Sequence, residues 1–275
     1  MLEVLRAGPL TTVQDLGRPG YAHLGVPRSG ALDVPALRAA NALVGNDSGA
    51  AGLEVTLTGC VLRSRVPAVL AVTGAQAVVR VDDAEMPYGE PFPVAAGSTV
   101  QIGRTSVGVR SYLAVAGGID VPPVLGSRST DTLSGLGPQP LRDNDVLPLG
   151  EPAGTSSTVD VPEYASRVEL RYRPGPRDDW CVESLAGSAY TLSPLSNRVG
   201  ARLAGPTLTR AVAGELPPEG VVLGAIQVPA DGQPLVFLAD HPTTGGYPVI
   251  GVVHPADLSG LAQARPGASV VFHGP

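Results

Sequence analysis

Hydrophobic residues recur along most of the chain as short runs rich in Val, Leu and Thr, separated by Gly and Pro. Runs of this length between turn residues are typical of β-strands. They predict strands at residues 53–58, 67–73, 76–81, 99–103, 107–115, 167–172, 220–228 and 235–239. Many short strands at turn-rich spacing favour a mainly β protein whose sheets close or pack as sandwiches. They argue against βαβ crossovers, which need much more helix.

Few segments have the pattern of a helix. The clearest begins after Asp33, which can cap the first turn, and ends before Gly45, which suits a left-handed stop. Pro35 is compatible with the first turn of this segment, for which we expect about ten helical residues. Shorter helices are expected at residues 178–186 and 256–263.

Two long stretches resemble each other. Residues 111–150 and 234–274 each contain an apolar strand, a Gly-Gly turn, the tetrapeptide Leu-Ser-Gly-Leu and a closing Val-rich strand. Residues 57–62 and 203–208 are similar in the same way. Such self-similarity predicts a duplicated supersecondary unit.

The duplication implies two related β-barrel-like domains. We place them at residues 1–150 and 160–275. The stretch 150–158 between them is rich in Gly, Ser and Thr, a composition typical of flexible polar linkers.

Composition excludes several classes of function. The 275-residue chain has 19 basic residues, and all of them are arginine. Without lysine it cannot form a P-loop or a Schiff base, and it cannot carry attached biotin. The net charge of −6 leaves no basic footprint for nucleic acid or anionic membranes. No signal peptide or membrane-spanning run is visible, so we expect a cytoplasmic protein.

Common catalytic and metal-binding signatures are missing from the sequence. It has no G-x-S-x-G, G-x-G-x-x-G, H-E-x-x-H or C-x-x-C motif. The cysteines, Cys60 and Cys181, are far apart, and the four histidines are scattered. We therefore expect no metal site.

Polar residues are concentrated in a glycine-punctuated segment, residues 11–33. There, backbone N–H groups can face a ligand, and an arginine fork can hold a carboxylate or a phosphate. The candidate binding residues are Gln14, Asp15, Arg18, Arg28, Ser29 and Asp33. The alternative interpretation is an ordinary solvated loop with an Asp–Arg pair.

A second polar segment, residues 226–248, contains an acid at the end of an apolar strand, followed by hydroxyls and glycines. This order is typical of an anion or amide pocket on a β scaffold. Asp240 is the candidate catalytic residue, able to orient or deprotonate. The candidate donors and close-approach positions are Thr243, Thr244, Gly245 and Gly246. The alternative is a Gly-Gly turn with Asp240 as a local cap, and no nucleophile–base pair is visible.

The strings TTVQDLGRPGY, GVPRSGALD, AANALVGN, LEVTLTG, GAIQVPADGQP and TTGGYPVI occur together, between about residue 2 and residue 272. With them the sequence resembles the family of the 5-oxoprolinase C subunit, also called KipA, allophanate hydrolase subunit 2 or biotin-dependent carboxyltransferase family protein. The resemblance implies two cyclophilin-like β-barrel domains. It also implies a heteromer with a KipI-like protein (allophanate hydrolase subunit 1) and a LamB/YcsF-type protein. Its implied reaction is ATP-dependent opening of 5-oxo-L-proline to L-glutamate.

The same resemblance suggests pocket residues. By similarity to the carboxyltransferase domain of urea carboxylase they lie at the QVP and TTGGYP motifs, and are Gln227, Thr243, Thr244, Gly246 and Tyr247. ATP would be a co-substrate, and its phosphate would have to be held by arginine, by backbone N–H groups or by a partner protein. His241-Pro242 replaces the family's usual Arg-Gln, which affects any phosphate or carboxylate contact made there. Leu32 replaces the usual Met, a volume-conserving change expected to be neutral.

Three functions remain open. The first is a non-autonomous component of an ATP-dependent lactam hydrolase. The second is a KipA-type regulatory protein that sequesters a KipI-like kinase inhibitor. The third is a component related to allophanate or urea carboxyltransferases, which would need biotin on a separate protein.

Overall fold

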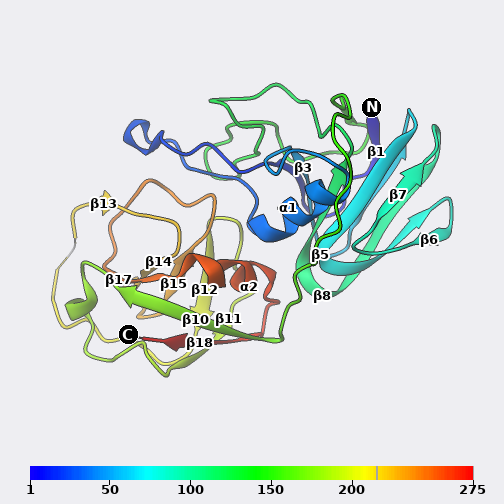
Figure 1. Cartoon of the computed structure of the whole chain (residues 1–275). Coiled ribbons are helices and arrows are strands. Elements are labelled where there is room, and N and C mark those ends of the chain that lie inside the picture. Colours follow the sequence, from blue (N-terminus) through cyan, green and yellow to red (C-terminus); the bar gives the residue numbers. More distant parts are fainter. Residues whose placement is uncertain (215, 275) are drawn as a thin grey trace. The chain divides into compact units, whose positions relative to one another are not determined.

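The computed structural model describes residues 1–214 and 216–274. The chain divides into two compact units (Figure 1). The first unit contains Met1–Arg18 and Ser29–Tyr164, and the second contains Pro19–Arg28 and Ala165–Pro275. The short segment Pro19–Arg28 therefore groups with the C-terminal half, a feature that the boundaries 1–150 and 160–275 do not include. The assignment of two independent domains stays a prediction.

One nine-stranded sheet forms the first unit. Five of its strands run in the order β2-β3-β8-β4-β1, with β9 at the end, while β5 pairs with β6, β7 and β8. The strands are β1 (Leu2–Arg6), β2 (Thr11–Gln14), β3 (Gly52–Thr56), β4 (Cys60–Ser64), β5 (Ala68–Val81), β6 (Ala84–Met86), β7 (Pro91–Val94), β8 (Thr99–Val115) and β9 (Val146–Leu147). The buried faces of these strands enclose one apolar core, which includes Leu53, Leu62 and Ile102.

The longest strands, β5 and β8, are each longer than the sequence pattern predicts. They pair antiparallel from Leu70↔Val115 to Val81↔Val100, with register shifts between Gly74 and Val79. Each corresponds to two predicted strands, because bulges interrupt the alternation of buried and exposed positions. Bulges bend a strand and increase its twist, so the irregularity lets the sheet curl around its core.

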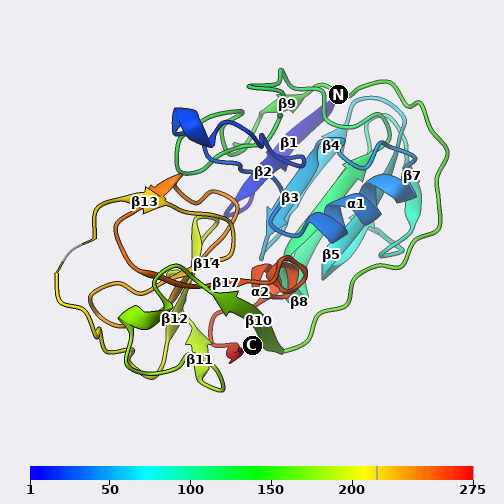
Figure 2. The same cartoon turned by 60° about the vertical axis from the view of Figure 1, so that its left-hand side comes forward.

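The helix predicted after Asp33 is confirmed as α1 (Val34–Leu43). Its cap is also confirmed, because the Asp33 carboxylate accepts a hydrogen bond from Ala36 N at 3.1 Å. Gly45 follows the helix with φ of 73°, the left-handed conformation expected for a stop. Figure 2 shows α1 lying over β5 and β8, where its apolar face packs against Ala71, Tyr112 and Ala114.

The stretch 150–158 has no regular secondary structure, but it is not the free linker that its composition suggests. Ser157 N donates to Ala42 O at 3.0 Å, at the C-terminal end of α1. A side chain at Gly154 would lie 2.2 Å from Gly45 O, so the two backbones approach each other closely there. The stretch therefore packs against the end of α1 and donates to a carbonyl of its last turn, which also accepts from Gly45 N at 3.2 Å.

The second unit contains a closed seven-stranded barrel, in the order β10-β17-β14-β15-β12-β11-β18. The parallel pair β10–β18 closes it, from Arg167↔Ser269 to Arg171↔His273. The strands are β10 (Arg167–Pro174), β11 (Ala189–Leu192), β12 (Gly200–Ala204), β14 (Ala225–Gln227), β15 (Leu235–Phe237), β17 (Val249–Val253) and β18 (Ser269–His273). A separate ribbon pairs β13 (Glu219–Gly220) with β16 (Thr244–Gly245). A mainly β fold with few short helices, the predicted class, is confirmed.

Helical structure in the second unit is short. The segment predicted at 256–263 forms a 3-10 turn, Pro255–Asp257, followed by α2 (Leu258–Gln263). The helix predicted at 178–186 is wrong, since only Asp178–Trp180 forms a 3-10 turn. Cys181 instead makes a β-bridge with Arg210, which holds the chain extended directly after that turn. A further 3-10 turn covers Ala22–Leu24. Among the described residues, no helix has the length and apolar character needed to cross a bilayer.

The sequence similarity between the two halves does not correspond to equal local structure. Leu-Ser-Gly-Leu is a turn at 133–136 but begins α2 at 258–261. Gly117 and Gly118 have positive φ, whereas Gly245 belongs to strand β16. The alignment of 111–150 with 234–274 is therefore wrong at these positions, because short Gly-rich strings fit several backbone conformations.

Candidate functional site

Asp15 is the centre of a buried polar cluster in the first unit. Its Oδ1 accepts from Gly17 N at 2.8 Å and from the hydroxyls of Ser127 at 2.6 Å and Ser129 at 2.5 Å. Its Oδ2 accepts from Arg128 N at 2.6 Å. Strand β2 ends just before Asp15, so this carboxylate fixes the loop 127–129 against the end of the strand.

Arg18 and Ser29 extend this cluster. The Arg18 guanidinium donates from Nε to Val124 O at 3.3 Å and from Nη1 to Ser29 Oγ at 2.9 Å, and it also bonds Ser129 O. Ser29 Oγ in turn donates to Asp131 Oδ2 at 2.6 Å. Arg18 is only 1% exposed. We call Asp15, Arg18, Ser29, Ser129 and Asp131 the N-terminal polar cluster.

Asp33 has a structural position at the start of α1. Besides capping Ala36, its carboxylate accepts a hydrogen bond from the Tyr164 hydroxyl, and its backbone N donates to the Tyr112 hydroxyl at 2.8 Å. Tyr112 donates to Glu54 Oε2 at 2.7 Å. Burial and the neighbouring Glu54 carboxylate raise the pKa of Tyr112 well above its usual value, so this hydroxyl remains a donor.

Gln14 and Arg28 differ in exposure. Gln14 is fully buried, and its amide donates to Thr12 Oγ1 at 3.0 Å and to Thr130 O at 3.1 Å. Arg28 is exposed, in the segment that groups with the second unit. Within the first unit, the structure thus brings Asp15, Arg18 and Ser29 into one bonded cluster.

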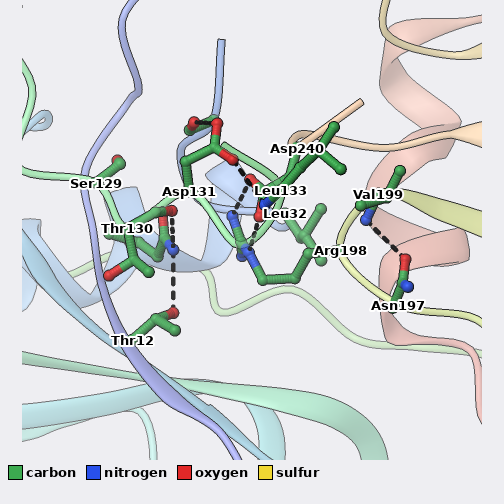
Figure 3. A network of polar contacts seen from close by, with 12 residues as sticks. Thr12, Leu32, Ser129, Thr130, Asp131, Leu133, Asn197, Arg198, Val199 and Asp240 are labelled. Atoms are coloured by element: carbon green, nitrogen blue, oxygen red, sulfur yellow. Dashed lines mark hydrogen bonds and ion pairs between the residues drawn. The ribbon is translucent and has the colours of Figure 1, made fainter. Parts of the chain in front are cut away.

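In the second unit, Asp240 forms a buried ion pair with Arg198 (Figure 3). Nε and Nη2 of Arg198 lie 2.9 and 3.0 Å from the two carboxylate oxygens, a bidentate arrangement. Both side chains are at most 1% exposed. The neighbouring Asn197 accepts from Val199 N at 2.9 Å, which shapes the turn that carries Arg198 (Figure 3). Because Arg198 engages both oxygens, Asp240 is better placed to orient than to abstract a proton.

His241 occupies one of the two positions that depart from the family string. Its ring lies on Phe237, with centroids 5.7 Å apart, and its Nδ1 is 2.7 Å from Pro242 O. The side chain is 7% exposed. Within the second unit, His241 therefore packs on the barrel wall at the end of β15.

The QVP and TTGGYP motifs meet at the end of β14. Gln227 Nε2 donates to Tyr247 O at 3.0 Å. A Cβ at Gly245 would lie 2.6 Å from this Nε2, so glycine is needed for the close approach. Thr243 O accepts from Val221 N at 3.0 Å, and Thr244 is exposed on β16. Tyr247 is 45% exposed, so its ring is available to solvent.

Arg210 also lies at this place, and the sequence motifs do not identify it. Its Nη2 donates to Val228 O at 3.2 Å, and its Cζ is 6.0 Å from the centroid of the Tyr247 ring. We call Arg210, Gln227, Thr244, Gly246 and Tyr247 the motif face. Arg198 is missed by the sequence motifs as well. A buried acid such as Asp240 requires a cation, but the sequence does not show which arginine supplies it.

A cavity of about 370 Å³ lies elsewhere in the second unit. Tyr172, Cys181, Leu185 and Ile250 contribute to its wall, and no residue of the motif face does. Partial burial and Glu183 raise the pKa of Cys181, so its thiol is less reactive than a free one. Among the described residues no group of three His, Cys, Asp or Glu side chains is placed to hold a metal ion.

Comparison with known proteins places the chain among carboxyltransferase-related proteins. The family model described as "Carboxyltransferase domain, subdomain A and B" matches residues 24–274. The chain is 43% identical to the C subunit of 5-oxoprolinase from Escherichia coli (strain K12), over 99% of this chain and 90% of that protein. It is 35% identical to urea amidolyase of Lachancea kluyveri, over 98% of this chain but 17% of that protein.

Comparison with solved structures points to the same family. The crystal structure of TTHA0988 matches with a TM-score of 0.90 and 39% identity, over 98% of this chain and 56% of that chain. The present chain thus spans a little over half of that structure. The K. lactis urea amidolyase structure matches with a TM-score of 0.90 and 32% identity, over 98% of this chain and 18% of that one. The chain therefore belongs to the carboxyltransferase subdomain A and B family, and its relatives there include 5-oxoprolinase C subunits.

Proposed function

We propose that the protein is the C subunit of an ATP-dependent 5-oxoprolinase, which opens 5-oxo-L-proline to L-glutamate. The observation that carries this proposal is the 43% identity to a 5-oxoprolinase C subunit over 99% of this chain and 90% of the relative. The match covers nearly all of this sequence and of its relative, so it is not confined to a short shared segment.

The reaction requires activation of a poor electrophile. Amide resonance makes the lactam carbonyl unreactive, and phosphorylation of its oxygen by ATP converts that oxygen into a leaving group. Water then adds to the carbon and the ring C–N bond breaks, which frees the amine and leaves the new carboxyl group as an acyl phosphate. A second water hydrolyses this acyl phosphate, and the products are L-glutamate, ADP and phosphate. A site for this chemistry must orient a small amide and hold its carboxylate.

The motif face has groups suited to the amide. The Gln227 amide is held by Tyr247 O, while the exposed Thr244 hydroxyl and the small Gly246 leave room for a ligand beside it. In this proposal these residues position the lactam, with ATP bound with help from partner proteins. Asp240 acts through the turns it fixes with Arg198, and its assignment as a proton acceptor stays a prediction.

We propose that the protein is not autonomous. Its relative is named as one lettered component of 5-oxoprolinase, which implies further components. We assign these partners as the KipI-like protein and the LamB/YcsF-type protein. The chain contains no lysine, so a phosphate that it contacts must be held by arginine or backbone N–H groups.

A second candidate is a carboxyltransferase-related role toward a urea-like amide. The urea amidolyase relatives favour it, with 35% identity over 98% of this chain. Biotin would have to be carried by another protein, because this chain has no lysine for its attachment. A biotin carboxylase encoded beside the gene would support this candidate, and a LamB/YcsF-type neighbour would support 5-oxoprolinase.

The test is reconstitution with the cognate KipI-like and LamB/YcsF-type proteins. The complete complex is expected to release L-glutamate and ADP from 5-oxo-L-proline and ATP, and each component by itself is expected to release none. A parallel assay supplies the same complex with urea, bicarbonate and a biotinylated carrier protein. A complex that hydrolyses ATP but never opens 5-oxoproline would contradict the substrate assignment. Carboxylation in the urea arm would establish the second candidate.

A further inference from the structure

Arg210 lies on the motif face with no acidic partner among the described residues. We propose that its guanidinium binds the carboxylate of the substrate, next to the Gln227 amide that positions the lactam. Arg210 is then the residue that makes the site specific for a lactam acid over a neutral amide. This inference rests on the proposed function, since only a substrate with a carboxylate needs such a contact.

The backbone around Arg210 is held by hydrogen bonds to the segment around Cys181, outside the barrel strands. Arg210 forms a β-bridge with Cys181. On either side of it, Val182 N donates to Thr209 O at 2.9 Å and Ala211 N donates to Trp180 O at 2.8 Å. A side chain that starts from a fixed backbone loses less entropy when it binds a ligand, so its position is preorganised.

The Arg210 side chain reaches both motifs. Its Nη2 bonds Val228 O at 3.2 Å, within the QVP motif. Its Cζ is 6.0 Å from the ring of Tyr247, in the TTGGYP motif, and Gln227 joins the two motifs through its bond to Tyr247 O. A cation and an amide thus lie at the same junction, as a lactam acid requires.

Other arginines near the motif strands already have acidic partners. Arg198 is bound bidentately by Asp240. Arg177 pairs with Glu219, the residue opposite Gly245 in the β13–β16 ribbon. In the described part of the chain the Arg210 side chain contacts Val228 O and the Tyr247 ring and forms no ion pair, and its Nε is buried with no hydrogen-bond partner. Its positive charge is therefore not neutralised by a carboxylate of the described residues, and Nη1 is not engaged by Val228 O.

Half-burial of Arg210 makes such a contact effective. A charge-assisted bond in a partly desolvated place is less screened than one at the surface, and the planar guanidinium matches the geometry of a carboxylate. Urea has no carboxylate and would gain nothing from this arginine. The chemical class predicted for the site is therefore a small cyclic amide with an adjacent carboxylate.

The test compares an acid with its neutral isostere in the reconstituted three-component complex. The substrates are 5-oxo-L-proline and 5-oxo-L-prolinamide, which have the same ring, and ring opening is measured by ADP release and product formation. In Arg210→Met, kcat/KM for the acid is expected to fall about 10- to 100-fold, mainly through KM. For the amide it should change less than about twofold. Arg202→Met, which removes an exposed arginine of β12, is the matched control and should leave both unchanged.

Arg210→Lys keeps the charge but loses the fork, and it is expected to recover part of the preference for the acid. If the Arg210→Met protein fails to assemble into the complex, Arg210→Lys takes its place in the comparison of acid and amide. Equal losses on acid and amide would overturn the inference, because they would indicate a purely structural role through Val228. An unchanged preference for the acid would overturn it too. A wild-type complex that opens neither compound would instead overturn the proposed function, and this inference with it.

Discussion

The N-terminal polar cluster and the motif face contain similar residue types, but they use them differently. In the cluster, Asp15 accepts four hydrogen bonds and Arg18 is 1% exposed, so the polar groups satisfy one another. On the motif face, Tyr247 is 45% exposed and Arg210 has no acidic partner among the residues described. Polar density in a glycine-rich loop is therefore compatible with either a structural or a binding role. Mutual satisfaction distinguishes the two, and the stability of variants in each region tests this difference.

The largest loss of stability is expected for Asp240→Ala. This change removes the bidentate carboxylate partner of the buried Arg198, and removing one member of a buried ion pair costs about 3–5 kcal/mol. Chemical denaturation of the isolated chain would measure the loss in the free energy of unfolding. Asp179→Ala, which removes an exposed acid of the same unit, is the control and should change it by less than about 0.5 kcal/mol.

The double variant Arg198→Met/Asp240→Leu sharpens this result. Replacing both members of the pair with apolar side chains removes the buried cation together with its carboxylate, so most of the lost stability should return. A double variant as unstable as Asp240→Ala would contradict the ion-pair explanation. Asp240→Asn, which keeps the shape of the side chain, tests the separate assignment of Asp240 as a proton acceptor. If that assignment is right, activity of the complex is abolished even in preparations that remain folded.

A somewhat smaller loss is expected for Asp15→Ala in the N-terminal polar cluster. Its removal leaves the hydroxyls of Ser127 and Ser129 and two backbone N–H groups without their acceptor. Unsatisfied buried donors cost about 1–3 kcal/mol each, and relaxation of the 127–129 loop limits the sum to about 3 kcal/mol. Thermal and urea unfolding would measure it, with Asp160→Ala at an exposed acid as control. A variant as stable as the wild type, but inactive in the complex, would show that Asp15 belongs to a binding site after all.

The sequence predicts the elements best where local signals agree. Asp33, Pro35 and Gly45 set the limits of α1 within about two residues, because capping is a property of neighbouring residues. The long strands β5 and β8 are each predicted as two, because a bulge interrupts the alternation on which the prediction depends. At 178–186 the pattern fits a helix, but the bridge from Cys181 to Arg210 outweighs local propensity.

The candidate site is only partly predictable, for a related reason. Motif strings identify Gln227 and Tyr247, which lie in conspicuous glycine- and proline-rich surroundings. Arg198 and Arg210 lie 42 residues before Asp240 and 18 residues before Val228. The first pair is brought together by the pairing of β12 with β15, and the segment of Arg210 is held by its bridge to Cys181. Nothing local in the sequence specifies which arginine meets which partner.

The smallest loss of stability, with a clear loss of activity, is expected for Tyr247→Ala. The ring is 45% exposed and its carbonyl, which holds Gln227, is retained in the variant. The free energy of unfolding should therefore change by less than about 1 kcal/mol, a shift of about 2–4 °C at most in Tm.

Activity depends on different contacts, because the Tyr247 ring lies 6.0 Å from the Arg210 Cζ and flanks the junction of the motifs. Without it, Arg210 gains rotamer freedom and the site gains water, so KM for 5-oxoproline in the reconstituted complex should rise about tenfold. Leu195→Ala, which truncates a side chain that is 72% exposed, should alter neither quantity. A Tyr247→Ala variant that loses stability as Asp240→Ala does, while its KM stays unchanged, would show that the motif face is a closed structural cluster like the N-terminal one.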